Sequence, residues 1–349
     1  MKRKAAWLAI LGAAVAVAGS LALVELARSW PVWLASWGRD ARRSADPSAL
    51  PDQFSVPLHR VSRTHVVVAG AAVAVGLANW QGPRGATTTV LLDTGASIPL
   101  LTSDGARLLR PETADRLGVK VDMRGSDGHR VTVMPLSEDE RLLLTLPGRT
   151  GAGPVYTPVW YAVADSLHDA HVIAPPTHLA PKGGAVRLDL RTSALVVCES
   201  LESCRPGKGW TRLARRACDK SPELVAVDAA VNDKPARLML DTGGSTKLFA
   251  AFYAQAGLVS SEVARSAAAL VGAGGVPADV IQVRGEYRLA LGVDAPVRRH
   301  APEMLVAQPR DRAGGVACFP DGALGLDALE GCEIVLTEAT PRRGYLRCP

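Results

Sequence analysis

The chain has 349 residues, of which 48% are hydrophobic and 5% aromatic, and 40 basic against 34 acidic residues give it a net charge of +6. This length suits about two domains of ordinary size, and the 33 glycines and 24 prolines favour a turn-rich β protein over a helical bundle or a disordered chain. The basic residues are scattered, apart from short groups at Lys2 to Lys4 and Arg212 to Arg216. A nucleic-acid-binding surface needs a denser basic stripe, so we expect no nucleic-acid partner.

A charge-free segment near the N-terminus predicts a membrane anchor within residues 1–37. Basic residues 2–4 precede residues 6–24, which carry no charge, are about long enough to cross a bilayer and favour a cytoplasmic N-terminus. A cleaved signal peptide is the alternative, because small residues near position 18 suit a cleavage site. Three tryptophans between residues 30 and 37 suit the membrane interface and favour the uncleaved anchor. In both cases we expect the body of the protein outside the cytoplasm, in the periplasm or the extracellular space, and secreted if the segment is cleaved.

Residues 38–55 predict a flexible linker, because they contain Pro47, Pro51 and several charges but little apolar periodicity. The strand signal begins at Val56. Apolar or β-branched runs separated by Gly and Pro turns then predict three strands, at residues 64–69, 72–79 and 87–92. The last run leads directly into Asp93.

A short motif occurs twice, as Asp93-Thr94-Gly95 and, 148 residues later, as Asp241-Thr242-Gly243. An apolar run precedes each aspartate, and the glycine lets the backbone turn where a Cβ would obstruct it. A strand with a short helix is predicted after each copy, at residues 100–117 and 248–257, so we expect an internal duplication. Two carboxylates held face to face cannot both ionise cheaply, and they would share one proton.

The motif pair resembles the aspartic peptidases, both the bilobal pepsin-like enzymes and the retropepsins. The resemblance implies that Asp93 and Asp241 hold and activate a water against a peptide bond, with a polypeptide as substrate and without metal or organic cofactor. It also implies that Thr94 and Thr242 each hydrogen-bond toward the other loop. Because both aspartates lie on one chain, we expect a monomer. The loop residues expected to support the dyad are Thr94, Gly95, Ser97, Thr242, Gly243 and Ser245.

Two turn-centred hairpins are predicted, at residues 121–133 and 269–283. In the aspartic peptidases such a hairpin is a flap that closes over substrate, and glycine-rich tips suit a moving element. An ordinary β-turn loop is the alternative for each. The candidate flap tips are Gly125, Ser126, Asp127 and Gly128 in the first half, and Gly272, Ala273, Gly274 and Gly275 in the second.

The segment Asp321–Leu329 resembles the retropepsin strand that passes behind the catalytic loop. There Gly325 would permit close backbone approach beneath Asp241. The first-half counterpart has Ala174 and Pro175 where the glycine and the helix start are expected. We therefore expect the first half to keep the architecture but to change the support beneath Asp93.

The residue three positions after each aspartate is Ala96 or Gly244, whereas pepsin-like enzymes carry a hydroxyl there. Without this hydrogen bond the carboxylates are less stabilised as anions. We therefore expect raised pKa values for the pair and an optimum at mildly acidic pH.

All six cysteines lie beyond residue 197, and an even number in an exported chain indicates disulfides. Strands predicted at residues 333–337 and 344–347 would bring Cys332 and Cys348 together at the open end of a hairpin. Cys198 and Cys204 would close a short loop, which leaves Cys218 for Cys318. Zinc binding is the rival use, but the chain contains no CxxC pair, and the HxxH spacing of His168 and His171 lacks a third ligand in register.

The sequence thus predicts an all-β, bilobal acid-protease fold of two retropepsin-like barrel lobes, preceded by a transmembrane or signal helix. The predicted parts are a membrane segment (1–37), a linker (38–55), a first lobe (56–205) and a second lobe (206–349). The expected activity is that of an aspartic endopeptidase, a membrane-anchored hydrolase. The alternative is a catalytically inactive peptide-binding or sensory module on the same fold.

Overall fold

The computed structural model describes residues 53–62, 65–77, 86–96, 99–109, 121–124, 130–135, 140–146, 155–157, 160–162, 170–181, 183–205, 207–213, 224–258, 262–265, 270–271, 277–278, 280–293, 295–307, 321–338 and 342–349. These residues are mostly in β-strands, with a few short helices, so the prediction of a mostly β protein is confirmed. None of the helices among them is both long and apolar enough to span a bilayer. The predicted membrane segment (1–37) lies outside the described residues.

A ten-stranded sheet occupies the first half of the chain. Its order is β6-β7-β10-β5-β11-β4-β3-β8-β9, and β2 pairs with β3. Helix α2 (Ser103–Leu109) follows β5. The strands are β2 (His59–Arg60), β3 (Val66–Leu77), β4 (Ala86–Leu92), β5 (Leu100–Leu101), β6 (Val121–Arg124), β7 (Arg130–Pro135), β8 (Glu140–Thr145), β9 (Val155–Thr157), β10 (Trp160–Ala162) and β11 (Val172–Ala174).

A seven-stranded sheet occupies the second half, in the order β15-β16-β23-β17-β22-β21-β18, and β19 (Leu270–Val271) with β20 (Pro277–Ala278) forms a separate pair. Helix α4 (Ala250–Gln255) follows β17. The strands are β15 (Ala226–Val231), β16 (Lys234–Leu240), β17 (Lys247–Phe249), β18 (Glu262–Arg265), β21 (Val280–Leu291), β22 (Val297–Ala307) and β23 (Gly322–Leu324).

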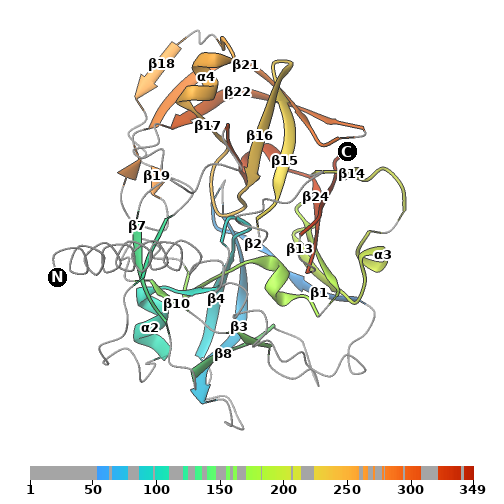
Figure 1. Ribbon diagram of the computed structural model, residues 1–349. Helices are drawn as coiled ribbons and strands as arrows, with labels where there is room; N and C mark the ends of the chain where they lie inside the picture. The colour runs from blue at the N-terminus through green and yellow to red at the C-terminus, as the bar shows by residue number, and fades with distance from the viewer. Residues whose placement is uncertain are drawn as a thin grey trace, which may run out of the picture.

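A six-stranded sheet joins the two halves, in the order β1-β13-β12-β24-β25-β14. Its central pair is β12 with β24, one strand from each half, and Leu188 faces Ile334 there. In Figure 1 β24, β13 and β1 run on the right, between the seven-stranded sheet above and the ten-stranded sheet below. The strands are β1 (Gln53–Pro57), β12 (Ala185–Asp189), β13 (Ala194–Cys198), β14 (Thr211–Arg212), β24 (Glu333–Thr337) and β25 (Gly344–Arg347), and α3 (Leu201–Cys204) follows β13.

One hydrophobic core runs through the sheets of both halves. It includes Val90 and Leu92 of β4, Leu238 and Leu240 of β16, and Leu188 of β12. The apolar runs that predicted strands before each aspartate are therefore buried on a shared core. This burial fixes the ends of β4 and β16 in space, and with them the loops that follow.

The sequence-based strand boundaries agree closely in the second half and differ in two places in the first. Strand β1 begins at Gln53, inside the predicted linker, because it pairs with β13. The two strands expected at 64–69 and 72–79 are one strand, β3, in which the register shifts between Ala69 and Ala71. Gly70, which predicted a turn, instead lies at a β-bulge, a place where glycine is favoured inside a strand.

A tight turn at Asn232 and Asp233 connects β15 to β16. Both residues have positive φ, 46° and 65°, and Val231 faces Lys234 across the hairpin. Two consecutive residues in this region define the two-residue turn whose twist matches that of paired strands, and Asn and Asp tolerate it better than most residues. The turn fixes the register of β16 and so the position of Asp241.

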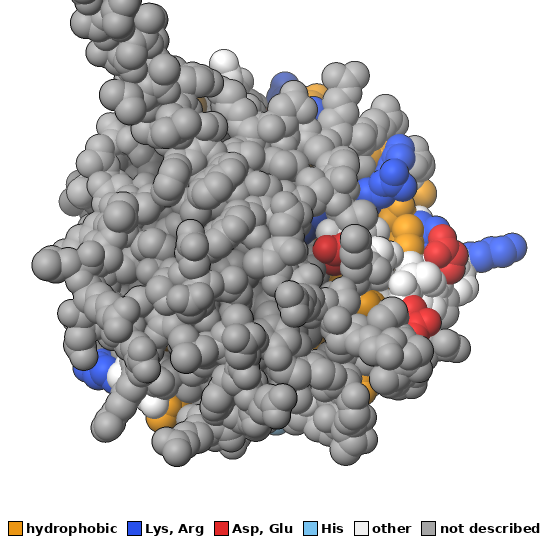
Figure 2. Space-filling view, turned by 60° about the horizontal axis from the view of Figure 1, so that its bottom comes forward, with side chains coloured by type: hydrophobic (Ala, Val, Ile, Leu, Met, Phe, Trp, Pro, Cys, Tyr) orange, Lys and Arg blue, Asp and Glu red, His pale blue; other side chains and the backbone are white. Residues whose placement is uncertain are grey.

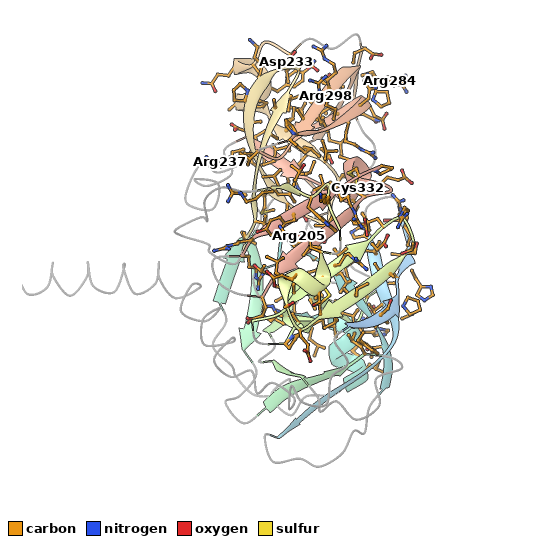
Figure 3. All side chains as sticks on the ribbon, turned by 90° about the vertical axis from the view of Figure 1, so that its right-hand side faces the viewer. Arg205, Asp233, Arg237, Arg284, Arg298 and Cys332 are labelled. Atoms are coloured by element: carbon orange, nitrogen blue, oxygen red, sulfur yellow. A yellow bond between two sulfur atoms is a disulfide. The ribbon has the colours of Figure 1, made fainter. Side chains whose placement is uncertain are left out.

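Two of the predicted disulfides are confirmed, Cys332–Cys348 and Cys198–Cys204. The first closes the β24–β25 hairpin, whose strands match the predicted residues 333–337 and 344–347. Figure 3 labels both Cys332 and Asp233. Asp233 is at the far end of the second-half sheet, and Cys332 lies well away from it. Cys218 and Cys318 lie outside the described residues.

Candidate active site

The two Asp-Thr-Gly loops meet through an exchange of hydrogen bonds between buried threonines. The amide of Thr94 donates to Thr242 Oγ1 (3.0 Å), and the amide of Thr242 donates to Thr94 Oγ1 (2.9 Å). Each hydroxyl in turn donates across to the strand before the other loop, Thr94 to the carbonyl of Leu240 and Thr242 to that of Leu92 (both 2.9 Å). These are the cross-loop contacts that the resemblance implies, and they lock the two loops in one relative position.

Each aspartate is also held from behind by a parallel strand. Strand β11 runs parallel to β4, and β23 runs parallel to β16. The amide of Asp93 donates to the carbonyl of Ala174 (3.0 Å), and that of Asp241 donates to the carbonyl of Leu324 (2.9 Å). A 3₁₀ helix follows each supporting strand, η3 (Pro176–Leu179) and η4 (Leu326–Leu329). The expectation that the first half keeps the architecture beneath Asp93 agrees with this geometry.

The two supports differ at the residue between strand and 3₁₀ helix. The amide of Gly325 donates to Thr246 Oγ1 (2.9 Å), whereas Pro175 occupies the same place in the first half and has no N–H to donate. A Cβ on Gly325 would lie 2.3 Å from the carbonyl oxygen of Gly244. The second loop therefore lies directly against the backbone of its support, as the glycine predicted.

Glycines bring the two carboxyl groups close to both loops. A Cβ on Gly95 would lie 2.9 Å from Oδ1 of Asp241 and 3.1 Å from Oδ1 of Asp93, and one on Gly243 would lie 2.5 Å from Cγ of Asp93. Each loop glycine thus contacts the carboxyl of the other half. The amide of Gly95 donates to Asp93 Oδ1 (2.7 Å). Any side chain at these glycines would displace a carboxyl group, so the pair depends on glycine at both positions.

The environment of the pair raises the pKa of Asp93 to about 7. The largest cause is burial, which disfavours the charged form, and the next is the neighbouring charge of Asp241. The amide of Gly95 and the charge of Lys247 act in the opposite direction. The missing hydroxyls at Ala96 and Gly244 predicted raised pKa values, whereas the largest causes for Asp93 are its burial and the neighbouring carboxyl. At mildly acidic pH the Asp93 carboxyl is therefore protonated.

Lys247 is a member of this site that the sequence analysis did not single out. It begins β17, is only 4% exposed, and its Nζ lies 3.8 Å from Oδ2 of Asp241. Asp241 is also buried, at 4% exposed. A signal was present in the sequence: a lysine stands directly before the segment predicted as strand and short helix at residues 248–257. A charge at such a position must find a partner.

A second polar group missed in the sequence is Asp327 of η4. Its Oδ1 accepts from the amide and the hydroxyl of Thr246 (2.9 and 2.5 Å). Thr246 in turn accepts from Gly325. This chain of hydrogen bonds ties the second loop to η4.

The remaining candidates are placed as follows. Ser245 is half-buried in the second loop, while Ser97 lies outside the described residues. The predicted hairpins are present as β6 paired with β7 and as β19 paired with β20, but both candidate flap tips (125–128 and 272–275) lie outside the described residues.

No cluster of three or more potential metal ligands occurs among the residues described. His171, from the HxxH spacing, accepts at Nδ1 from the amide of Thr89 (3.3 Å).

The chain matches no family model and no curated protein. Solved structures with some similarity to it include Basic 7S globulin from soybean, at 12% sequence identity and a TM-score of 0.43, which covers 85% of this chain and 94% of that one. Conglutin gamma, a basic 7S globulin from lupine seeds, gives the same identity and TM-score and covers 85% of this chain and 95% of that one.

Proposed function

We propose that this chain is an aspartic endopeptidase whose dyad is Asp93 and Asp241. The observation that carries the proposal is the reciprocal hydrogen bonding of Thr94 and Thr242 between the two loops. It holds two carboxyl groups against each other at the ends of buried strands, with one of them protonated near neutral pH. A proton shared between two adjacent carboxyls is the arrangement that activates water against an amide.

The proposed fold is the bilobal acid-protease fold, built from two retropepsin-like halves. Its support is the matching order of strand pairings around each aspartate. In the first half β4 is parallel to β11, which is antiparallel to β5, which is parallel to β10. In the second half β16, β23, β17 and β22 repeat the same sequence of pairings. Each half then adds a hairpin to the six-stranded sheet.

The proposed reaction uses the two carboxyls in different roles. Asp241, beside Lys247, is the ionised member and takes a proton from the water as its oxygen attacks the peptide carbonyl carbon. Asp93 gives its proton to the carbonyl oxygen, so a neutral tetrahedral diol forms. When the diol collapses, the C–N bond breaks, Asp241 returns its proton to the leaving nitrogen, and one diol hydroxyl gives its proton back to Asp93. Both carboxyls then regain their starting states.

We further propose that the enzyme acts outside the cytoplasm, tethered by its N-terminal segment, as a monomer on polypeptide substrates. The disulfides Cys198–Cys204 and Cys332–Cys348 support an oxidising compartment. The absence of a nucleic-acid partner stays a prediction from the scattered basic residues of the sequence. Basic, acidic and hydrophobic side chains stand side by side at one edge of the face in Figure 2.

A second candidate function is an inactive peptide-binding module on the same fold. The observation that favours it is the ion pair of Lys247 with Asp241, because a cation beside a dyad carboxyl can also neutralise it. The intact Asp-Thr-Gly in both halves favours the enzyme, since a binder does not require both carboxylates.

The deciding experiment compares the purified full-length chain in detergent with Asp93→Asn and Asp241→Asn, using a peptide library between pH 4 and 7. The matched control is Asp233→Asn, at an exposed turn where Asn adopts the same positive φ. We expect cleavage by the unmodified chain and the control, and a loss of at least roughly a hundredfold in each dyad variant. Absence of cleavage at every pH, with peptide binding unchanged by either substitution, would favour the binding module.

A further inference from the structure

Lys247 is buried on the face of the second-half sheet that is opposite to the main hydrophobic core. Its backbone faces Ala323 on β23 and Leu305 on β22, and Met239 of β16 faces Ala323 from the other side. The opposite face of these strands carries the large core residues, among them Leu240 and Leu324. Lys247 therefore does not extend into the main core but lies on the face from which it reaches Asp241.

A buried ammonium is stable only when it is paired, because removing the charge from water costs several kcal/mol. A chain selected for packing alone would place an apolar residue at this strand position. The structurally equivalent position in the first half is the buried Leu100 of β5, which faces Ile173 of β11 as Lys247 faces Ala323 of β23. The positive charge therefore belongs to one half of the duplication and not to the general architecture of both.

The other charged and titratable side chains on the elements around β17 are paired elsewhere or exposed. Glu303 on β22 accepts from Gln282 (2.6 Å), and Asp321 before β23 accepts from the amide of Arg237 (2.7 Å). Asp327 of η4 accepts from Thr246. The others are Arg298, which is exposed, Arg299, which donates to the carbonyls of Ala328 and Glu330, His300, which pairs with Glu286, and Tyr253 of α4, which contacts the hydroxyl of Tyr287.

We propose that Lys247 is a positioning residue of the dyad: its ammonium holds the negative charge on Asp241, so that the shared proton resides on Asp93. In this arrangement Lys247 and the singly protonated pair together carry no net charge, which favours their burial. The part of this inference that concerns cleavage rests on the proposed function. The part that concerns the location of the proton does not, because it holds for the folded protein without substrate.

The test compares Lys247→Met, which keeps length and packing but removes the charge, with Lys247→Arg, which keeps the charge. The first measurement is a carboxyl ¹³C NMR titration of the full-length chain, in which the Asp93 signal is identified by its loss in Asp93→Asn. Because the charge of Lys247 lowers the pKa of Asp93, Lys247→Met should move this titration upward by roughly one pH unit. Lys247→Arg keeps the charge, so it should shift the Asp93 titration by less than about half as much as Lys247→Met does.

The second measurement is the pH profile of peptide cleavage. With Lys247→Met both limbs should move to higher pH, since the pair then gains and holds protons more readily, and Lys247→Arg should restore the original profile. An unshifted Asp93 titration in Lys247→Met overturns the inference, as does an unshifted cleavage profile with a rate that is only lowered or raised. If the unmodified chain cleaves nothing, the proposed function fails, and the NMR titration alone still decides the role of Lys247.

Discussion

The two Asp-Thr-Gly loops share their backbone arrangement and differ in the side chains around it. In both halves the aspartate amide donates to the strand behind it, and the threonines exchange equivalent hydrogen bonds. Only the second loop has the glycine-to-threonine hydrogen bond beneath it and, among the described residues, a lysine beside its carboxyl. The comparison teaches that the duplicated topology sets the geometry of the dyad, while unmatched side chains decide which carboxyl carries the charge.

The largest effect is expected where the halves are most alike. Thr94→Ala should leave the Thr242 amide and the Leu240 carbonyl without their buried partners, and Thr242→Ala should do the same to the Thr94 amide and the carbonyl of Leu92. Each substitution should lower the free energy of unfolding by roughly 2 to 6 kcal/mol. The measurement is urea-induced unfolding, with Thr94→Ser and Thr242→Ser as controls that keep the hydroxyl. A large cost for one threonine and none for the other would break the symmetry of the exchange.

The next effect concerns the charge assigned to the first carboxyl. Since the pKa of Asp93 is raised to about 7 in the folded protein and is about 4 in an unfolded chain, the folded state binds more protons between these values. Stability should therefore fall as pH rises from about 4 to about 7, by roughly 2 to 4 kcal/mol from this group.

Asp93→Asn should remove this part of the pH dependence, because an amide does not titrate. Urea unfolding of the unmodified chain and of Asp93→Asn at pH 4, 5.5 and 7 measures the difference. Equal slopes in the two proteins would mean that Asp93 does not hold the proton in the folded state.

The smallest effect sharpens the difference between the two supports. Gly325→Ala should cost roughly 1 to 3 kcal/mol, because the new Cβ meets the Gly244 carbonyl oxygen at 2.3 Å and backbone cannot move aside cheaply. Pro175→Ala should cost less than about 1 kcal/mol, since it adds no atom to the contact and only loosens the unfolded chain.

Thermal unfolding of both variants checks the order, and peptide cleavage should fall more in Gly325→Ala than in Pro175→Ala. A larger loss at Pro175 would mean that the first support is the more constrained of the two.

Much of this protein is determined by local sequence. The apolar runs before Asp93 and Asp241, the glycines of the motif, the strands on either side of Cys332 and Cys348, and the turn at Asn232 follow from patterns within a few residues. Strand periodicity and turn chemistry act over that range. The candidate dyad, the mostly β fold and two disulfide pairings could therefore be predicted from the sequence alone.

Other features were decided only by tertiary structure, because they depend on residues far apart in the chain. Gly70 is at a bulge and not a turn because β4 pairs with β3 on both sides of it. Gln53 belongs to a strand because it pairs with Cys198 of β13. The first support still holds Asp93 despite Pro175, because the parallel pairing of β11 with β4 places the carbonyl of Ala174 against the Asp93 amide. Lys247 was visible in the sequence as a charge directly before a predicted strand, but only the pairing of the sheet determines that it lies beside Asp241. Sequence thus supplied the two carboxyls, and tertiary packing made them unequal.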